Sequence, residues 1–373
     1  MDATADPMIR LDGVGKRYAD GVVAVQELSF DVARGSVAVL IGPSGCGKTT
    51  TMRMINRLVQ PTSGRIFVGG EDVTRSDAVQ LRRQLGYVIQ HVGLFPHQDV
   101  LANVETVPRL LGWDRRRASA RARELLDLVG LPPDRFAARY PTELSGGQRQ
   151  RVGVARALAA DPPVLLMDEP FGAVDPIARE RLQAEFLRLQ DQVRKTVVFV
   201  THDMDEAIRL GDRIAVMRQG GVLEQYDEPS VLLTAPATDF VADFVGARRT
   251  LRRLAVVNID PECLVMWPSV DADARIGDTT AAFDATESDW VVVLEDGTPV
   301  GWFARADAAR GGVVRDGMKA LTALDASARL DVAMAALLDV AAPGLPVTVD
   351  GRYAGVLTPA AVVDSARGDG GAR

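Results

Sequence analysis

The chain has 373 residues, which is enough for one large domain and a smaller one, each with its own hydrophobic core. Hydrophobic residues make up 47% of it and charged residues 25%, as in ordinary soluble globular proteins, and the net charge of −7 gives no reason to expect a nucleic-acid partner. No signal peptide and no run of about 18 apolar residues is recognisable, and two distant cysteines, Cys46 and Cys263, suit a reducing cytoplasm.

Residues 8–246 are expected to form an α/β domain, because short apolar runs alternate there with helical patterns. The runs at 37–41, 164–167 and 196–200 predict buried parallel strands. Residues 91–150 differ in character and predict an inserted helical subdomain. Within it, residues 115–129 have helical periodicity, with Leu125, Leu126 and Val129 on the face expected to be buried.

A phosphate-binding loop follows the first of these strands and precedes a helix expected at 50–58. Residues 42–49 match G-x-x-x-x-G-K-[ST] in the strand–helix context that this motif requires. Glycines let backbone N–H groups approach phosphates; Lys48 can neutralise the β- and γ-phosphates, and Thr49 can place its hydroxyl on Mg²⁺. We predict that a nucleoside triphosphate is held by Gly42, Pro43, Ser44, Gly45, Cys46, Gly47, Lys48, Thr49 and Thr50.

Polar side chains end the other two predicted strands. Asp168 is placed to support Mg²⁺ through its water shell, and Glu169 can polarise an attacking water as a general base. An acidic pair after a strand is also common in a solvated turn, and the phosphate loop favours the catalytic interpretation. His202 follows the run at 196–200, at the sheet edge where ligands of open α/β sheets gather, although a lone histidine is more often structural.

The C-terminal third contains an internal repeat. Asp296-Gly297 recurs as Asp350-Gly351, 54 positions later (350 − 296), and Gly301 recurs as Gly355. The same shift pairs Arg275 with Arg329, Ile276 with Leu330, Phe283 with Leu337, and Val293 with Val347. This constant register predicts a duplicated unit, with chance alignment of short valine-rich strands as the alternative. The basic stretch at 247–253 predicts a linker in front of it.

The segment Leu144-Ser-Gly-Gly-Gln148 presents a hydroxyl and backbone donors near a helix start, as a γ-phosphate requires. Together with the phosphate loop, it resembles the ATP-binding subunits of ABC transporters, whose domain combines a RecA-like P-loop core with a helical subdomain. In that family the LSGGQ motif caps the ATP held by a second copy. The resemblance therefore implies a dimer with two ATP molecules at its interface.

The same resemblance implies roles for individual residues. His202 matches the histidine that contacts the γ-phosphate. Gln90 matches the glutamine that senses Mg²⁺ and the attacking water, and Asp175 matches the loop through which the two subunits communicate. Tyr18 matches the aromatic residue that stacks on adenine, with a core tyrosine as the alternative. The implied catalytic residues are Lys48, Gln90, Glu169 and His202, the implied metal site is Thr49, Gln90 and Asp168, and Ser145, Gly146, Gly147 and Gln148 act on the partner's nucleotide.

Three pairs of segments restrict the resemblance to one group of ABC transporters. They are residues 52–58 with 61–66, residues 93–97 with 107–113, and residues 225–227 with 239–246. They are similar to the ATP-binding subunits of importers for glycine betaine, choline, carnitine or proline. The resemblance implies separate permease subunits, an extracytoplasmic binding protein and a peripheral place on the cytoplasmic face of the membrane. Import of another polar solute such as an amino acid, and a soluble regulatory ABC ATPase, are the alternatives.

Residues 254–373 resemble a tandem pair of CBS domains, an α+β module that ends several osmoprotectant ATPases. Nucleotide sites of that module pair a hydroxyl three residues after the glycine with an Asp three further on. The first copy has Ala304 and Asp307, and the second has Thr358 and Ala361, so each keeps half of the pair. A degenerate pair leaves dimerisation, a response to ionic strength and a structural role open.

Overall fold

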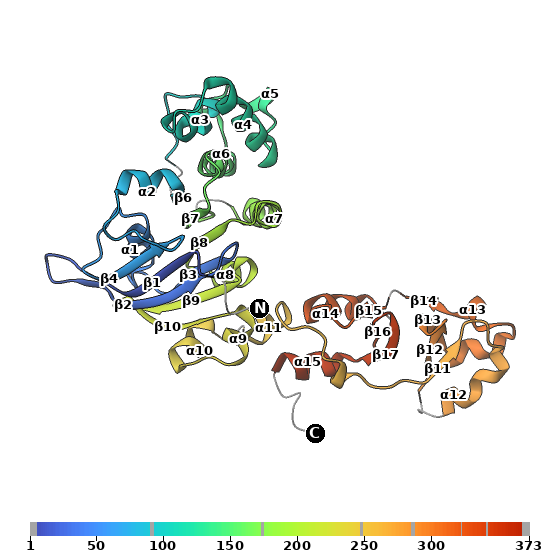
Figure 1. Cartoon of the computed structure of the whole chain (residues 1–373). Helices are drawn as coiled ribbons and strands as arrows, with labels where there is room; N and C mark the ends of the chain where they lie inside the picture. The colour runs from blue at the N-terminus through green and yellow to red at the C-terminus, as the bar shows by residue number, and fades with distance from the viewer. Residues whose placement is uncertain are drawn as a thin grey trace. The chain divides into compact units, whose positions relative to one another are not determined.

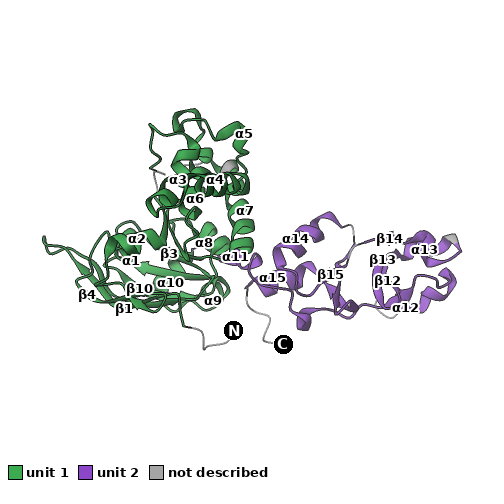
Figure 2. Ribbon diagram, turned by 45° about the horizontal axis from the view of Figure 1, so that its top comes forward, with its two compact units in different colours: residues 1–245 green, residues 246–373 purple. Residues whose placement is uncertain are grey.

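The computed structural model describes residues 6–89, 93–172, 175–246, 249–284, 288–321, 323–340 and 342–367. The chain separates into two compact units, residues 1–245 (unit 1) and 246–373 (unit 2), which Figure 2 draws in green and purple. Among the described residues, no helix combines the length and the apolar character needed to cross a membrane.

Unit 1 is built on one sheet, whose described strands lie in the order β5-β4-β1-β2-β10-β9-β3-β8-β7-β6. One half of the sheet is parallel and comprises β3 (Val37–Ile41), β6 (Leu85–Val88), β7 (Val164–Asp168), β8 (Thr196–Val200) and β9 (Arg213–Arg218). The other half pairs mainly antiparallel and comprises β1 (Ile9–Arg17), β2 (Val23–Val32), β4 (Ser63–Val68), β5 (Glu71–Asp72) and β10 (Val222–Asp227).

The three buried parallel strands predicted from apolar runs are confirmed as β3, β7 and β8. Every residue in these strands is buried, because helices cover both faces of a parallel sheet. Helix α1 (Lys48–Ile55) contributes Met52 and Ile55 to the same core cluster as Leu40 of β3 and Leu166 of β7. The phosphate loop is therefore fixed at both ends by elements of the core.

A layer of helices lies beyond the β6 edge of the sheet, at the top of unit 1 in Figure 1. It contains α3 (Val100–Leu110), α4 (Arg115–Leu128), α5 (Pro133–Phe136), the 3-10 helix Pro141–Glu143 and α6 (Gly146–Leu158). Leu125, Leu126 and Val129 are buried, as their periodicity predicts. The other helices of unit 1 are α2 (Ala78–Gln84), α7 (Pro176–Val193), α8 (Met204–Leu210), α9 (Pro229–Thr234) and α10 (Asp239–Val245).

Unit 2 contains two small sheets. The first consists of β11 (Ser269–Asp271), β12 (Trp290–Glu295), β13 (Thr298–Ala304) and β14 (Lys319–Ala320), and the second of β15 (Leu324–Asp325), β16 (Leu345–Val349) and β17 (Arg352–Leu357). The helices are α11 (Arg249–Leu254), α12 (Thr280–Asp284), α13 (Val314–Gly317), α14 (Leu330–Asp339) and α15 (Pro359–Arg367), with 3-10 helices at Pro261–Cys263, Ile276–Thr279 and Arg305–Arg310.

Strand pairing confirms the internal repeat. Val293 pairs with Gly301 in the first sheet, and the residues 54 positions on, Val347 and Gly355, pair in the second, with a register shift directly after each. The turns match as well, because the Asp-Gly pairs at 296–297 and 350–351 both have positive φ, with 51° and 82° in the first and 53° and 77° in the second. Two consecutive positive φ values define the type I′ hairpin, for which Asp-Gly is a preferred sequence.

The two repeats of unit 2 pack against each other through a cluster that includes Val292, Trp302 and Val356, with Trp267 and Trp290 beside it. The first repeat has its own core around Phe283 and Phe303, and the second has its own around Leu330, Leu345 and Leu357. Helix α11 packs against α14 and α15. A helix therefore occupies most of the segment 247–253, for which the sequence predicts a linker.

Candidate nucleotide site

The loop between β3 and α1 has a backbone that requires glycine at two positions. Gly42 has φ of 154° and Gly47 has φ of 97°, values that L side chains rarely adopt. A Cβ atom at Gly42 would collide with the carbonyl of Met217, and one at Gly47 with the carbonyl of Ala24. No side chain caps the start of α1 at Gly47, so the backbone N–H groups of its first turn can serve an anion.

Lys48 lies against this loop. Its Nζ donates hydrogen bonds to the carbonyl oxygens of Gly42, at 2.7 Å, and Pro43, at 3.1 Å, and it lies 3.6 Å from the buried Cys46 Sγ. The ammonium group is thus held at the loop, where it is in reach of any phosphate that the loop binds.

The carboxylates at the end of β7 meet the loop from the neighbouring strand. The Thr49 hydroxyl donates a hydrogen bond to Asp168 Oδ1 at 3.2 Å. Burial raises the pKa of the Asp168 carboxyl, and the hydrogen bond from Thr49 opposes this shift. These two oxygens are hard ligands of the kind that Mg²⁺ prefers, and they already lie next to each other.

Glu169 has a strained backbone that is fixed by the next strand. Its φ is 45°, in the left-handed region, and its N–H donates to the carbonyl of Val200 at 3.0 Å. The carboxylate oxygen Oε1 lies 3.4 Å from Nδ1 of His202, which follows β8. The ends of two parallel strands therefore bring the predicted base and the predicted γ-phosphate contact together.

One open cavity of about 540 Å³ collects most of the predicted phosphate-binding residues. It is lined by Ala24, Ser44, Gly45, Cys46, Gly47, Lys48, Thr49, Thr50, Glu169 and His202. Tyr18 is not among these residues; it lies between β1 and β2, its side chain is partly exposed, and Lys16 Nζ lies 5.1 Å from the centre of its ring. Gln90 lies outside the described residues.

Four residues of the LSGGQ segment, Ser145 to Gln148, line a different cavity of about 290 Å³ together with Asp175. Ser145 is the N-cap of α6: its Oγ accepts from the N–H of Gln148 at 3.2 Å, and Gln148 Oε1 accepts from the N–H of Ser145 at 3.0 Å. This reciprocal capping box fixes the start of the helix from within the segment itself. The structure does not place these residues around the cavity of the phosphate loop.

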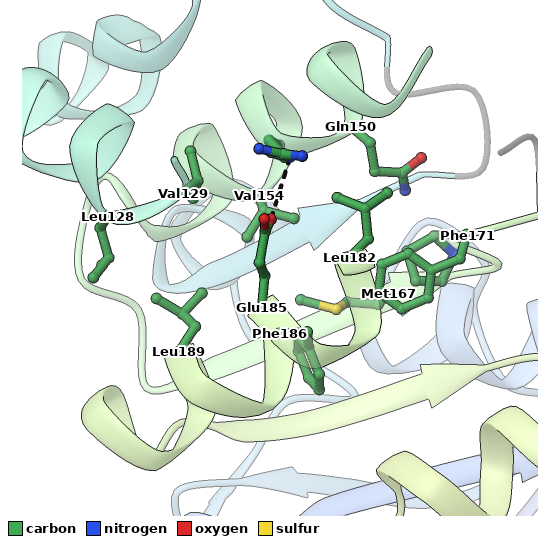
Figure 3. Close-up of a pocket in the computed structure, with 12 residues that line it drawn as sticks. Leu128, Val129, Gln150, Val154, Met167, Phe171, Leu182, Glu185, Phe186 and Leu189 are labelled. Carbon is green, nitrogen blue, oxygen red and sulfur yellow. Dashed lines mark ion pairs between the residues drawn. The ribbon is translucent and has the colours of Figure 1, made fainter. Parts of the chain in front are cut away.

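Two features of this region have no signal in the sequence. The first is a small apolar cavity of about 40 Å³ between β7, α6 and α7, lined by residues such as Phe171, Leu182 and Leu189 (Figure 3). An ion pair of 3.2 Å between Arg151 and Glu185 joins the two helices beside it. This cavity has room for a few water molecules and none for a nucleotide. The second feature is a polar contact between α7 and α8, in which Gln183 Nε2 donates a hydrogen bond to Glu206 Oε1 at 3.0 Å.

Comparisons with known proteins agree with this geometry. Residues 25–172 match the sequence model of the ABC transporter family. The osmoprotectant import ATP-binding protein OsmV of Salmonella typhimurium is 48% identical over 308 residues, which are 81% of this chain and 80% of OsmV. The chain belongs to the ATP-binding subunits of ABC transporters. A second relative in this family, the glycine betaine/carnitine/choline transport ATP-binding protein OpuCA of Bacillus subtilis, is 54% identical over 245 residues, which are 66% of this chain and 64% of OpuCA.

Solved structures confirm the P-loop ABC ATPase fold of unit 1. The dimeric structure of MJ0796, a bacterial ABC transporter cassette, has a TM-score of 0.54 and 35% sequence identity, and the match covers 60% of this chain and 99% of the cassette. A post-hydrolysis state of the same cassette, bound to ADP and phosphate, matches with a TM-score of 0.54 and 34% identity over the same shares of the two chains. This ABC ATPase therefore has the fold of a cassette that hydrolyses ATP.

Proposed function

We propose that the chain hydrolyses ATP to drive import of a quaternary-ammonium osmoprotectant through separate permease subunits, from a peripheral position on the cytoplasmic face of the membrane. The convergence of Lys48, Thr49, Glu169 and His202 on one cavity supports the ATPase activity. The substrate class is supported by relatives named for the transport of glycine betaine, carnitine and choline, or of choline alone. An extracytoplasmic binding protein would deliver the solute to the permease.

The chemistry follows from the residues around the cavity. The β- and γ-phosphates of ATP lie against the loop N–H groups and Lys48. Thr49, Gln90 and, through the water shell of the ion, Asp168 would hold Mg²⁺, which when bound would neutralise phosphate charge. Glu169 accepts a proton from the attacking water. The oxygen of that water bonds to the γ-phosphorus, and the bond between the γ-phosphorus and the bridging oxygen breaks, which releases ADP. His202 contacts the γ-phosphate and Glu169, Gln90 orients the water, and Tyr18 stacks on adenine.

The working unit is a dimer. Ser145, Gly146, Gly147 and Gln148 line a cavity other than that of the phosphate loop, and the similar cassette MJ0796 forms dimers. In the proposed dimer each LSGGQ segment covers the γ-phosphate on the partner, and Asp175 carries the communication between subunits. Closure on ATP and reopening after hydrolysis would move the attached permease subunits.

Unit 2 is proposed to be a degenerate pair of CBS domains with a regulatory role. The strand pairs, turns and helices of its repeats support this assignment. Thr358, the one hydroxyl retained at the usual nucleotide position, accepts a hydrogen bond from the N–H of Ala361 at 3.2 Å and caps α15. Because this hydroxyl serves a helix, we expect weak nucleotide binding at unit 2.

The test is reconstitution of the chain with its permease subunits in lipid vesicles, with ATP hydrolysis as the readout. The binding protein loaded with glycine betaine should stimulate hydrolysis, whereas the same protein without ligand should not. Stimulation by an amino acid and not by glycine betaine would replace the proposed substrate class. Unstimulated hydrolysis under every condition would favour a soluble regulatory ATPase.

A further inference from the structure

Five polar side chains, here called the α7–α8 seam, join the helix that follows Asp175 to the helix that follows His202. They are Arg179 and Gln183 of α7, the N-cap residue Asp203, and Glu206 and Arg209 of α8. Gln183 Nε2 donates to Glu206 Oε1 at 3.0 Å, Arg209 Nη1 donates to Gln183 Oε1 at 3.4 Å, and Arg179 Nη1 lies 3.8 Å from Asp203 Oδ2. Spacings of three and four residues place each set on one face of its helix.

Glu206 stands at the centre of the seam and is buried, with 6% of its surface exposed. Burial raises the pKa of its carboxyl, and the neighbouring hydroxyl of Thr201, which is 2% exposed, opposes this shift. The same hydroxyl oxygen accepts a hydrogen bond from the N–H of Asp203 at 3.0 Å. A buried carboxylate is costly unless its hydrogen-bonding capacity is used. Gln183 uses part of that capacity, and the neighbouring Thr201 connects the carboxylate to the residues immediately before and after His202.

His202 depends on this backbone for its position. Its side chain is 65% exposed, so packing does not fix it, and the described contact of its ring is with Glu169, at 3.4 Å. A shift of the backbone at 201–203 would therefore move the ring away from Glu169. The N–H of Thr201 donates to the carbonyl of Leu40 at 3.2 Å, which anchors the same segment to β3.

We propose that Glu206 is a positioning residue for ATP hydrolysis, which holds Thr201 and thereby His202 against Glu169. Through Gln183 it also ties the position of His202 to α7, and so to the Asp175 loop at the start of that helix. The inference rests on the proposed function, because it assumes that His202 and Glu169 act on bound ATP. It adds a residue that touches neither nucleotide nor metal.

The test compares ATP hydrolysis and thermal unfolding of the full chain in the wild type, Glu206→Ala, Thr201→Val and the double variant. Because the phosphate loop is unchanged, KM for ATP should stay within about twofold, while kcat falls about tenfold in each single variant. The double variant should also lose about tenfold, since both changes break one chain of contacts. Glu206→Gln, which keeps an acceptor for Thr201, should recover part of the loss.

The control is Gln225→Ala, which removes a buried side chain that bonds Ala235 and Ala237, away from the cavity. It should lower the unfolding temperature and leave kcat unchanged. Glu206→Ala with lowered stability and unchanged kcat, or a double variant that loses about a hundredfold, would overturn the inference. If Glu206→Ala does not fold, Thr201→Val alone carries the test, and an unchanged kcat in that variant would overturn the inference. A wild type that does not hydrolyse ATP would instead refute the proposed function.

Discussion

Glu169 has a strained backbone at the point where a general base is proposed. Its φ of 45° is maintained by the bond from its N–H to Val200 and turns the side chain toward His202. Strain of this kind persists where the surrounding structure holds it, and it is frequent at active sites. The sequence predicts the identity of this residue from the motif, while the backbone conformation becomes visible only in the structure.

Replacing Glu169 by Gln tests the proposed base. The amide keeps the shape of the side chain and cannot accept a proton, so hydrolysis should fall by about 10²- to 10⁴-fold. Binding of ATP should be unchanged, and the closed dimer should accumulate. The measurements are phosphate release and size-exclusion chromatography with Mg·ATP. Turnover near the wild-type rate would mean that another group acts as the base.

The buried carboxyl of Asp168 should make the stability of the folded chain depend on pH. Its pKa is raised in the folded chain by burial, so the folded state binds the proton more tightly than the unfolded state does. Stability from this group is therefore present below the ordinary pKa of 3.8 and is lost as pH rises through the folded value. Without Mg²⁺, the unfolding temperature of Asp168→Asn minus that of the wild type should increase from pH 4 to pH 7. A difference that is constant with pH would contradict the raised pKa.

Helix α6 shows how one element serves both folding and the proposed dimer. Ser145→Ala removes a cap and should cost about 1 kcal/mol of stability. Because the same hydroxyl is proposed to contact the partner's ATP, hydrolysis should fall by much more than this loss of stability explains. Asp114→Ala is the matched control: Asp114 caps α4, so this change should lower stability to a similar extent and leave hydrolysis unchanged. Equal hydrolysis by the two variants would argue against a trans role.

The hairpins of unit 2 allow a second test at this scale. Gly297→Ala and Gly351→Ala place a side chain at positive φ without any collision, so each should destabilise unit 2 by about 1 kcal/mol. Gly277→Ala is the control, because it meets no atom either and its φ is not positive. Three of the four tryptophans lie in unit 2, so intrinsic fluorescence reports its unfolding. Unchanged midpoints would contradict the type I′ turns.

Apolar runs in the sequence predict the strands that end at the phosphate loop, at the carboxylates and at His202. Each of these runs is followed directly by a recognisable motif. The sequence does not predict the α7–α8 seam, since Arg179 and Gln183 at helical spacing look like an ordinary solvated face. The sequence does not predict helix α11 either, because a short basic stretch shows no apolar periodicity. Helix α11 is stabilised by its contacts with α14 and α15. The contact with α15 joins residues more than a hundred positions apart in the sequence.

At the scale of the whole molecule, an ABC ATPase unit precedes a duplicated α+β unit in one chain. OsmV is similar over 308 residues, more than the ATPase unit contains, so the likeness extends into unit 2. The proposed role for the chain therefore combines hydrolysis by unit 1 with regulation by unit 2. In the proposed function the substrate contacts the permease and the binding protein, so uptake of the substrate is the property to measure.

The most direct test is uptake of labelled glycine betaine at high and low osmolarity by a strain that lacks this chain and other betaine importers. The wild-type chain should restore osmotically stimulated uptake. Lys48→Ala should not, because the loop loses the ammonium group that is proposed to neutralise the phosphates. Equal uptake with the wild type and Lys48→Ala would contradict ATP-driven import of glycine betaine by this protein.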